Sequence, residues 1–482
     1  MNAPSLDAVV VGAGPNGLSA AVALARAGYT VKVLEGTSKI GGGCRSAELT
    51  KPGFVHDICA AVHPMGVSSP FFQRLPLGEH GLTWLHTDIP LANPFDDGSA
   101  SALHRDLDVT AASLGDDGPA YKELMEPLLA RWDELAPDLL GPLRPPNHPI
   151  LMARFGLKAL RSSAGLYRSL FRGEHARALL GGISAHALVP LDGLATASFG
   201  LVMGVVGHAY GWPVARGGSQ SIVNALASYL RSLGGEIETE HVVRSMADIP
   251  PSRVVLFDLT PRQVSAICGD QLPAGYRERL AAYRYGPGSF KIDYALSGPV
   301  PWTAEVCRRA GTVHVAGTLE EMVLSERAIH EGKVVDRPYV LFAQQSVADP
   351  SRAPAGQHTG WAYCHVPHGS TIDMTSRIEA QIERFAPGFR DLVLASAARG
   401  PRQIEAYNEN FIGGDINGGQ QDLLQLFTRP VARVDPYSTP NPRLFFCSSS
   451  TPPGGGVHGM CGYFAALSAV DRLGGDRHVL PW

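Results

Sequence analysis

The sequence predicts an α/β protein built around a parallel sheet, and two observations lead to this fold class. Residues 8–35 read as a short apolar strand, a glycine-rich turn, an amphipathic helix and a second strand, the order found in a βαβ unit. Close to the other end, residues 444–447 read as a buried strand that leads through another glycine-rich turn into a helical pattern over 463–473. We therefore expect both ends of the chain to belong to one domain, which the residues between them interrupt.

The first turn carries the pattern Gly12-x-Gly14-x-x-Gly17 between the strand and the helix. Gly12 permits a tight turn, Gly14 lets the backbone approach a pyrophosphate, and Gly17 lets the helix pack closely on the sheet. Pro15 and Asn16 lie at the start of the helix, whose positive end then faces the phosphates. The pattern predicts a Rossmann-type dinucleotide-binding unit in which these five residues bind the cofactor.

An acid at the end of the second strand supports this interpretation. Glu35 follows Gly17 by 18 residues, close to the spacing of about 20 expected for a carboxylate that accepts hydrogen bonds from a ribose hydroxyl. A carboxylate here disfavours a 2′-phosphate, so NADP is not expected. The alternative, a glycine-rich turn without a nucleotide, leaves the position of this acid unexplained.

Glycines 41–43, Cys44 and Arg45 follow directly beyond the predicted ribose site. This segment resembles the second phosphate and ribityl contact of FAD-linked two-domain oxidoreductases, a feature that nicotinamide dehydrogenases generally lack. A flexible surface loop would account for the glycines but not for their position. The resemblance implies FAD contacts at Gly42, Gly43, Cys44 and Arg45. Because no His or Cys lies in a recognised flavinylation motif, we expect the FAD to be bound non-covalently.

The C-terminal glycine-rich turn resembles the Thr-x-Pro-Gly-x-Gly-x-x-Gly signature of phytoene desaturases and their relatives, which passes beneath the isoalloxazine. It is a poor second dinucleotide turn, because Pro452 and Pro453 break the strand-to-turn connection. Its glycines instead bring main-chain N–H groups against a flat ring, and the dipole of the next helix favours negative charge on a reduced flavin. The resemblance implies FAD contacts at Thr451, Gly455, Gly456, Val457 and Met460.

Two internal segments extend the resemblance over nearly the whole chain. Gly217–Gln220 opens a helical pattern, and Val243 beyond it resembles the valine whose backbone contacts the adenine. Residues 405–419 contain Gly-Gly-Asp-Ile-x-Gly-Gly, as in the phytoene-desaturase-like branch related to pyridine nucleotide-disulphide oxidoreductase domain-containing protein 2. The chain departs from its relatives at residues 448–450, which are serines, and at His458, where carotenoid desaturases usually have proline. A carotenoid substrate is therefore not implied.

The resemblance implies a discontinuous FAD-binding domain interrupted by a substrate domain with a mixed sheet and a helical subdomain, as in the amine oxidase/phytoene desaturase superfamily. Alternation over 290–296 predicts a half-buried antiparallel strand, and Ile378, Ile382 and Phe385 share one face of a predicted helix. The expected parts are FAD-binding residues 1–100, 211–265 and 431–482, a helical insertion at 101–210, and a substrate domain at 266–430.

Two stretches of the helical insertion bear on membranes. Residues 151–180 carry six cations against the single acid Glu174, so this segment could lie on an anionic lipid surface or present a solvated helix face. Residues 193–215 contain 23 residues without Asp, Glu, Lys or Arg, long enough to span a bilayer. Because Gly200, Gly204, Gly207, Gly211 and Pro213 interrupt them, we interpret them as a buried helix and connection that line an apolar cavity.

The composition narrows the classes of function. A formal charge of −4 without a basic cluster argues against nucleic acid as a partner. The seven cysteines include no CxxC pair, so we expect neither a metal site nor a disulfide framework, and a reducing cytoplasm is the expected location. The first strand begins by Ala8, so no signal peptide is expected. The oligomeric state stays open, a homo-oligomer included.

With FAD bound, the expected reaction is hydride transfer between a substrate carbon and flavin N5, with oxygen or a quinone as electron acceptor. Trp361, Tyr363 and His365 alternate, so a strand would place them on one face against an unsaturated substrate. His63 and His458 lie on segments that the family places around the flavin. The full set of candidates is His63, Trp361, Tyr363, His365, Asp415 and His458, although the histidines could serve as structural hydrogen-bond partners and Asp415 as a turn-stabilising carboxylate.

The sequence therefore predicts a phytoene-desaturase-like, FAD-dependent oxidoreductase. Its expected substrate is lipophilic and unsaturated, and the reaction is desaturation, saturation or isomerisation. One alternative is an amine oxidase-like flavoenzyme, which shares the fold. The other is a flavin-holding interaction protein with little turnover.

Overall fold

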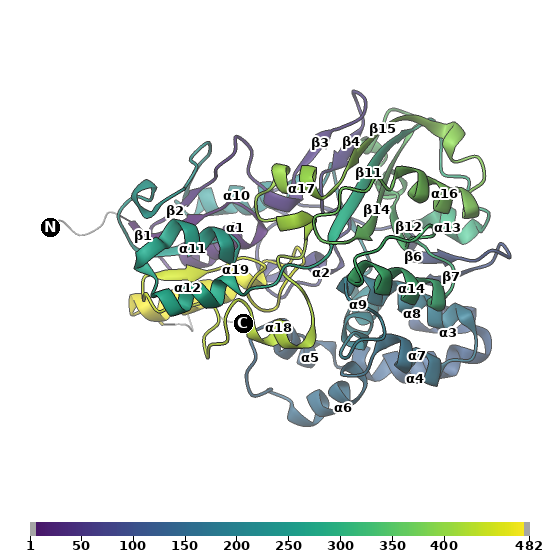
Figure 1. Ribbon diagram of the computed structural model, residues 1–482, viewed down its shortest axis with the longest axis horizontal. Coiled ribbons are helices and arrows are strands. Elements are labelled where there is room, and N and C mark those ends of the chain that lie inside the picture. The colour runs from purple at the N-terminus through teal and green to yellow at the C-terminus, as the bar shows by residue number, and fades with distance from the viewer. Residues whose placement is uncertain (1–5, 477–482) are drawn as a thin grey trace.

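The computed structural model describes residues 6–476 and contains a parallel sheet, a mixed sheet and a helical lobe (Figure 1). All pairings in the first sheet are parallel, in the order β16-β10-β1-β2-β9. Its strands come from both ends and the middle of the chain, which confirms the predicted fold class. They are β1 (Leu6–Val11), β2 (Val31–Leu34), β9 (Glu236–Glu238), β10 (Ser252–Phe257) and β16 (Leu444–Phe446).

Helices cover both faces of the parallel sheet, which explains why the central parts of β1 and β10 are continuous apolar runs. Ala8 and Val10 of β1 point to one face, and Val9 and Val11 point to the other. Helices α1 (Pro15–Arg26), α10 (Gln220–Ser232) and α19 (Met460–Leu473) contribute to the core on the first face, and α11 (Pro261–Cys268) and α12 (Ala274–Ala281) to the core on the second.

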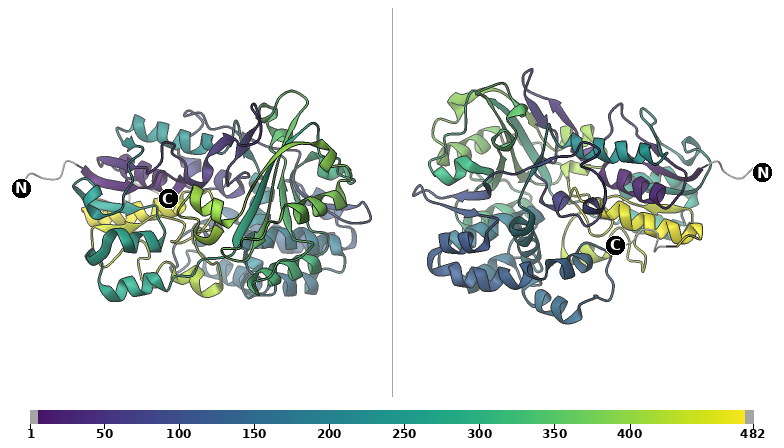
Figure 2. Two further views of the ribbon diagram at one scale, coloured as in Figure 1. Left: turned by 45° about the horizontal axis from the view of Figure 1, so that its top comes forward. Right: turned by 180° about the vertical axis from the view of Figure 1, so that it is seen from behind.

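The second sheet has the order β15-β11-β14-β13-β12-β6-β7, and its pairings are antiparallel except that β6 runs parallel to β12. Figure 2 shows it beside the parallel sheet, with the helical lobe packed against it. The strands are β6 (Ile89–Pro94), β7 (Ala100–Leu103), β11 (Gly288–Leu296), β12 (Ala310–Val315), β13 (Val340–Ala343), β14 (His358–Val366) and β15 (Val393–Arg399).

Residues 290–296 form the predicted antiparallel strand as part of β11, but the prediction of half-burial is wrong, because β11 is buried along its whole length. The predicted helix, α16 (Thr375–Phe385), covers one face of the strand with Ile378 and Ile382. On the other face Lys291 and Asp293 form a buried ion pair. The alternating charged residues therefore mark a buried pair rather than a solvated face.

Two predicted domain boundaries differ from the structure. Strand β6 already begins at Ile89 and belongs to the mixed sheet with β7, because β6 pairs with both β12 and β7. Helices α11 and α12, which extend to residue 281, pack on the parallel sheet through an apolar core that contains Val264 and Leu280. The middle part of the dinucleotide-binding domain therefore continues beyond residue 265.

The helical lobe surrounds α9 (Ala197–Tyr210), which is largely buried, as the sequence predicts. Gly200 lets α9 approach its neighbours, since a Cβ atom there would lie 2.1 Å from the hydroxyl oxygen of Tyr167. Within residues 6–476, no helix is both long enough and apolar enough to cross a bilayer. The other helices of this lobe are α3 (Leu107–Ser113), α4 (Gly118–Leu129), α5 (Trp132–Leu139), α6 (Pro149–Ala159), α7 (Ser163–Leu170) and α8 (Glu174–Ser184).

Shorter elements connect these layers. The strands are β3 (Ser46–Glu48), β4 (Val55–Asp57), β5 (Trp84–Leu85) and β8 (Val214–Ala215). The helices are α2 (Pro64–Val67), α13 (Glu305–Arg309), α14 (Leu319–His330), α15 (Gln345–Ala348), α17 (Pro401–Tyr407) and α18 (Leu423–Thr428).

A buried ion pair connects the end of β4, at Asp57, with the short turn Pro350–Arg352 that precedes β14. The guanidinium of Arg352 contacts the Asp57 carboxylate and donates to the carbonyl of Val55, and both charged side chains are shielded from solvent. The other oxygen of Asp57 accepts from the Ser219 N–H (2.7 Å) and the Ser46 hydroxyl (2.8 Å). Burial opposes ionisation of Asp57, yet Arg352 and the Ser219 N–H outweigh it and hold the pKa of that carboxyl below its usual range.

We predict that Arg352→Met lowers the free energy of unfolding by about 3–5 kcal/mol, because it leaves Asp57 buried without its countercharge. Urea unfolding followed by far-UV circular dichroism measures the loss. Because the pKa of Asp57 is depressed in the folded state, the difference from wild type is complete at neutral pH and shrinks as the pH falls through that pKa.

Arg253→Met is the matched control, since Arg253 pairs with Asp7 at the surface and should contribute below about 1 kcal/mol. Equal losses in the two variants would show that burial does not strengthen the Asp57–Arg352 pair.

Candidate functional site

A cavity of about 1370 Å³ lies between the parallel sheet, the mixed sheet and the helical lobe. It extends from Glu35 and Val243 past the glycine-rich turn to the walls formed by α6 and α9. Small-molecule sites usually have volumes of about 300–1,000 Å³. The cavity therefore has room for a dinucleotide and a second molecule.

The turn between β1 and α1 has no room for side chains. Gly12 adopts a φ of +104°, which favours glycine. A Cβ atom on Gly14 would lie 2.6 Å from Oδ2 of Asp258, and one on Gly17 would lie 2.1 Å from the carbonyl oxygen of Gly12. Gly12, Gly14, Pro15 and Asn16 line the cavity, whereas Gly17 does not. The bare backbone at the N-terminus of α1 fits a pyrophosphate.

Glu35 connects this turn to the following glycine segment. Its Oε1 accepts from the Thr37 N–H (3.0 Å) and from the guanidinium of Arg45 (3.1 Å), and its Oε2 accepts from the Ala13 N–H (3.1 Å). A carboxylate oxygen can accept two hydrogen bonds. Oε2 therefore keeps one acceptor position at the cavity wall, as a ribose hydroxyl requires.

Asp258 is a site residue that the sequence analysis missed. It directly follows β10, and its Oδ2 accepts from the Gly17 N–H at 3.0 Å. Burial raises the pKa of this carboxyl to about 8, although the Gly17 N–H acts in the opposite direction. The position after the apolar strand 254–257 was the available signal, but Asp258 lies 241 positions from Gly17 in the sequence, which concealed the contact.

The second glycine segment is held by residues from the middle of the chain. Residues Gly42–Cys44 form a 3₁₀ turn. Gly42, Gly43 and Cys44 line the cavity, and so does Arg45, which follows the turn. The hydroxyl of Tyr407 donates to the Gly42 carbonyl at 2.6 Å, and the guanidinium of Arg45 lies 5.4 Å from the centre of the Tyr407 ring. Tyr407 is thus a second missed residue of the site.

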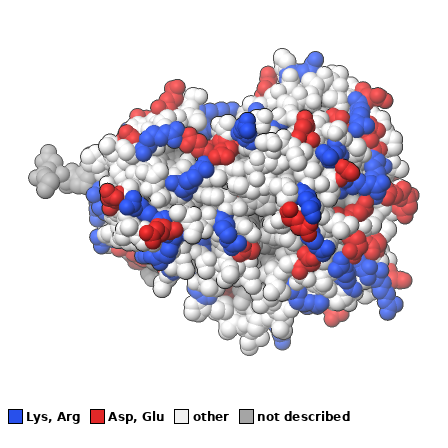
Figure 3. Space-filling view, in the orientation of Figure 1, with Lys and Arg blue, Asp and Glu red and all other residues white. Residues whose placement is uncertain are grey.

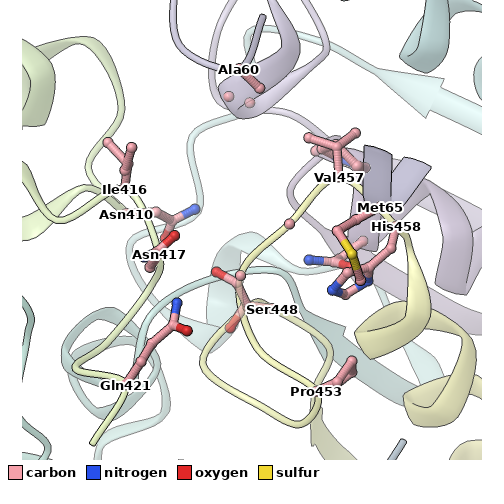
Figure 4. A pocket seen from close by; sticks show the side chains of 18 of the residues that line it. Ala60, Met65, Asn410, Ile416, Asn417, Gln421, Ser448, Pro453, Val457 and His458 are labelled. Carbon is pink, nitrogen blue, oxygen red and sulfur yellow. The ribbon is translucent and has the colours of Figure 1, made fainter. Parts of the chain in front are cut away.

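The C-terminal glycine-rich loop forms another wall, where Gly455, Gly456 and Val457 line the cavity. Figure 4 shows Val457 and Met65 on one side of the space, with Asn417 and Gln421 opposite them. Thr451 and Met460 do not line the cavity and instead hold the loop. The Thr451 hydroxyl donates to the Ser448 carbonyl (2.8 Å), and the Met460 N–H donates to Nδ1 of His458 (3.0 Å).

His63 and His458 both line the cavity as neutral imidazoles, because burial lowers the pKa of each to about 4. Nε2 of His63 lies 2.8 Å from the Ser219 hydroxyl, which gives its own proton to the Ala60 carbonyl. His63 must therefore be the donor in this pair, which leaves its Nδ1 unprotonated. Within the described chain this buried nitrogen has no hydrogen-bond partner, so it fits a donor group on a bound ligand.

The four remaining candidates divide into two pairs. Trp361 and Tyr363 line the cavity, with ring centres 5.1 Å apart. His365 is buried behind them, where its Nδ1 lies 2.7 Å from Oε2 of Glu326. Asp415 accepts from the N–H groups of Gly286 and Asn417, each at 2.8 Å, as expected for a turn-stabilising carboxylate. His365 and Asp415 are therefore outside the cavity wall.

The comparisons with known proteins agree with this geometry. The NAD(P)-binding Rossmann-like domain family matches residues 10–75. The chain is 26% identical to pyridine nucleotide-disulfide oxidoreductase domain-containing protein 2 of Rattus norvegicus, over 96% of this chain and 93% of that protein. It is 25% identical to phytoene desaturase (neurosporene-forming) of Rhodobacter capsulatus, over 94% and 92%. A putrescine oxidase double mutant matches with a TM-score of 0.61 and 18% identity, over 97% and 99%.

These homologues confirm the predicted resemblance, because the chain is similar over nearly its whole length to oxidoreductases that include a phytoene desaturase. The Rossmann-like match and the desaturase relative support FAD as the dinucleotide. The likeness to putrescine oxidase shows the shared fold alone.

We predict that Glu35→Gln weakens FAD binding about tenfold to a hundredfold, because it removes the charge that strengthens hydrogen bonds from the ribose and from Arg45. The dissociation constant is measured by fluorescence titration of the apoprotein with FAD. Glu236→Gln is the control, since Glu236 is exposed on the neighbouring β9 and lies 4.0 Å from Lys32. An unchanged FAD affinity in Glu35→Gln would contradict the ribose assignment.

Proposed function

We propose that this protein uses FAD to oxidise, reduce or isomerise a lipophilic unsaturated substrate. The observation that carries the proposal is the continuity of the cavity. The cavity runs without interruption from its dinucleotide end, at Gly14 and Glu35, to a second end. The wall of that second end is formed by α6, α9 and β13, which contribute Phe155, Val202 and Leu341. The apolar wall favours a ligand that is largely hydrocarbon.

The bound FAD would supply the hydride acceptor or donor, with oxygen or a quinone as the terminal acceptor. Gly455, Gly456 and Val457 would support the flavin ring with bare backbone. Trp361 and Tyr363 offer aromatic faces on which conjugated double bonds can stack. The helical lobe covers this end of the cavity and excludes water from the reacting carbons.

An amine oxidase is the second candidate, and it is favoured by the fold and by the neighbouring aromatic rings of Trp361 and Tyr363. An amine substrate is mostly cationic at neutral pH and would need compensation for lost hydration. The acidic residue that lines the α5 side of the cavity is Asp138. Its carboxylate already accepts a hydrogen bond from the Asn147 N–H and lies 3.8 Å from the guanidinium of Arg144, so its charge already has partners within the chain. The wall therefore supports a neutral substrate better.

We predict that an unsaturated lipid changes the redox state of the flavin without oxygen. The holoprotein is mixed anaerobically with phytoene, farnesol or putrescine while the visible absorbance of the flavin is followed. If the protein is a desaturase, a polyene bleaches its flavin. If it is a saturase, flavin that has first been reduced with dithionite regains its colour when the polyene is added. Bleaching by putrescine alone would favour the amine oxidase. A flavin that responds to none of the three compounds, with no isomerised product in the mixture, would favour a binding protein.

We also propose that the cavity opens toward an anionic membrane surface. Leu143, Leu157 and Phe427 line the cavity and are also exposed, Leu157 to 78%. In Figure 3 the lower edge of the molecule, where α6 and α18 lie, is mostly uncharged with scattered basic side chains. Apolar groups at the mouth of a cavity would let a water-insoluble substrate pass directly from the lipid.

The cations of the basic segment 151–180 do not form one continuous face. Arg168 forms an ion pair with Glu320, and Arg177 with Glu174. Arg154, Lys158 and Arg161 lie on or just after α6 and have no acidic partner within residues 6–476. Arg172 is the fourth cation of the segment without an ion pair in the described part of the chain, but it lies beyond α7. The three cations on or just after α6 lie close in sequence to the cavity-lining Leu157, so they are the ones we assign to lipid phosphates.

We predict that Arg154→Gln, Lys158→Gln and Arg161→Gln together weaken binding to phosphatidylserine vesicles about a hundredfold at low salt, since each cation contributes roughly 1 kcal/mol. Co-sedimentation measures the effect, and flavin content should not change. Arg168→Gln is the matched control because Glu320 already neutralises Arg168. Wild-type protein that does not sediment with these vesicles would show that the basic segment is simply solvated.

A further inference from the structure

His186 is a polar group in an otherwise apolar part of the cavity. It lies in the short 3₁₀ turn Ala185–Ala187 that follows α8, and its imidazole lines the cavity beside Trp212. The two rings meet edge to face with centres 5.1 Å apart. Neither the fold prediction nor the set of candidate residues from the sequence included His186.

One nitrogen of His186 is anchored behind the wall. Its Nε2 lies 3.1 Å from Nε2 of His314, which is fully buried on β12. Next to His314 along the sheet come Leu341 of β13 and Tyr363 of β14, two residues that line the cavity. His314 therefore fixes the ring of His186 against the sheet that forms the floor of the cavity.

The surroundings of His314 decide which histidine donates in this pair. Burial lowers the pKa of His314 to about 3 and holds the pKa of His186 well below its usual value, so each ring carries one proton. Nδ1 of His314 has no partner in the described part of the chain, and a Cβ atom on Gly182 would lie 2.5 Å from it.

A buried N–H without a partner is rarer in proteins than a buried bare acceptor. The proton of His314 is therefore placed on Nε2, which donates to Nε2 of His186. His186 then carries its own proton on Nδ1. No residue between 6 and 476 accepts a hydrogen bond from this N–H, and the imidazole is accessible from the cavity.

We propose that His186 binds an uncharged oxygen of the substrate, so that the substrate is an oxygenated polyene, an alcohol or an aldehyde, rather than a pure hydrocarbon. This inference rests on the proposed function. A hydroxyl or carbonyl oxygen accepts from the Nδ1–H group, whereas a hydrocarbon would cover this group and leave it without a partner. A carboxylate is less suitable, because the imidazole is neutral and the wall around it is apolar.

The hydrogen bond would also fix the position of the double bonds. A flexible apolar chain can slide along an apolar wall, since the hydrophobic effect has no direction. A single oxygen held by His186 sets the register of the chain relative to Trp361 and Tyr363. His186 is in this sense a specificity residue, and His314 is a positioning residue that acts through it.

Farnesol and farnesene test the inference, because both are unsaturated fifteen-carbon chains and only farnesol carries a hydroxyl. Each is labelled and partitioned between phosphatidylcholine vesicles and the holoprotein, and the ratio of the two dissociation constants is compared between variants. In His186→Leu we expect farnesol binding to weaken about tenfold or more while farnesene binding stays unchanged. His186→Gln, which keeps an N–H donor, should restore part of the preference for farnesol.

Met203→Leu is the matched control, since Met203 lines the same cavity without a hydrogen-bonding group and the volumes are similar. Its ratio should equal that of wild type, and flavin content reports that each variant is folded. Equal weakening of both ligands in His186→Leu, or no weakening of either, would overturn the role of His186. If wild-type protein binds neither compound, the proposed lipophilic substrate fails, and this inference fails with it.

Discussion

Close backbone contact around the N-terminus of α1 is the constraint on which the rest of the structure depends. A Cβ atom on Gly17 would lie 2.1 Å from the carbonyl oxygen of Gly12, and one on Gly462 would lie 1.9 Å from the carbonyl oxygen of Asn16. Asp258 fills the remaining side and accepts from the Gly17 N–H. Three segments far apart in the sequence can meet at one helix end because the glycines leave this space free. The dinucleotide site is the product of that contact.

This arrangement separates cofactor binding from substrate choice. The fold is shared with a putrescine oxidase, and the chain is similar in sequence to a phytoene desaturase, although these two relatives differ in activity. The second half of the cavity comes from α6, α9 and the mixed sheet, where side chains such as Phe155 and Val202 line the wall. The fold therefore supports flavin chemistry, whereas the identity of the substrate depends on the wall of the helical lobe.

Sequence reasoning succeeded where a local pattern determines the structure and failed where distant segments meet. The strand, turn and helix over 8–35, the helix with Ile378 and Ile382, and the strand with Trp361 and Tyr363 each follow from residues close in sequence. Asp258, Tyr407 and His186 reach the cavity only through the folded chain, so no periodicity marks them.

Alternation in the sequence also predicts the face of the sheet on which a side chain lies, but not how deeply it is buried. The sequence therefore did not reveal that His365 lies behind the cavity wall or that Lys291 and Asp293 form a buried pair.

The histidines on the cavity wall show how burial controls the chemistry of a side chain. Burial holds His63, His186 and His458 neutral at pH 7, so the wall presents single hydrogen-bond donors and acceptors without charge. Such groups can orient an uncharged lipid without the hydration that ions would retain in the cavity. Hydride transfer is favoured where water is kept away from the reacting carbon, because water would compete for reactive intermediates.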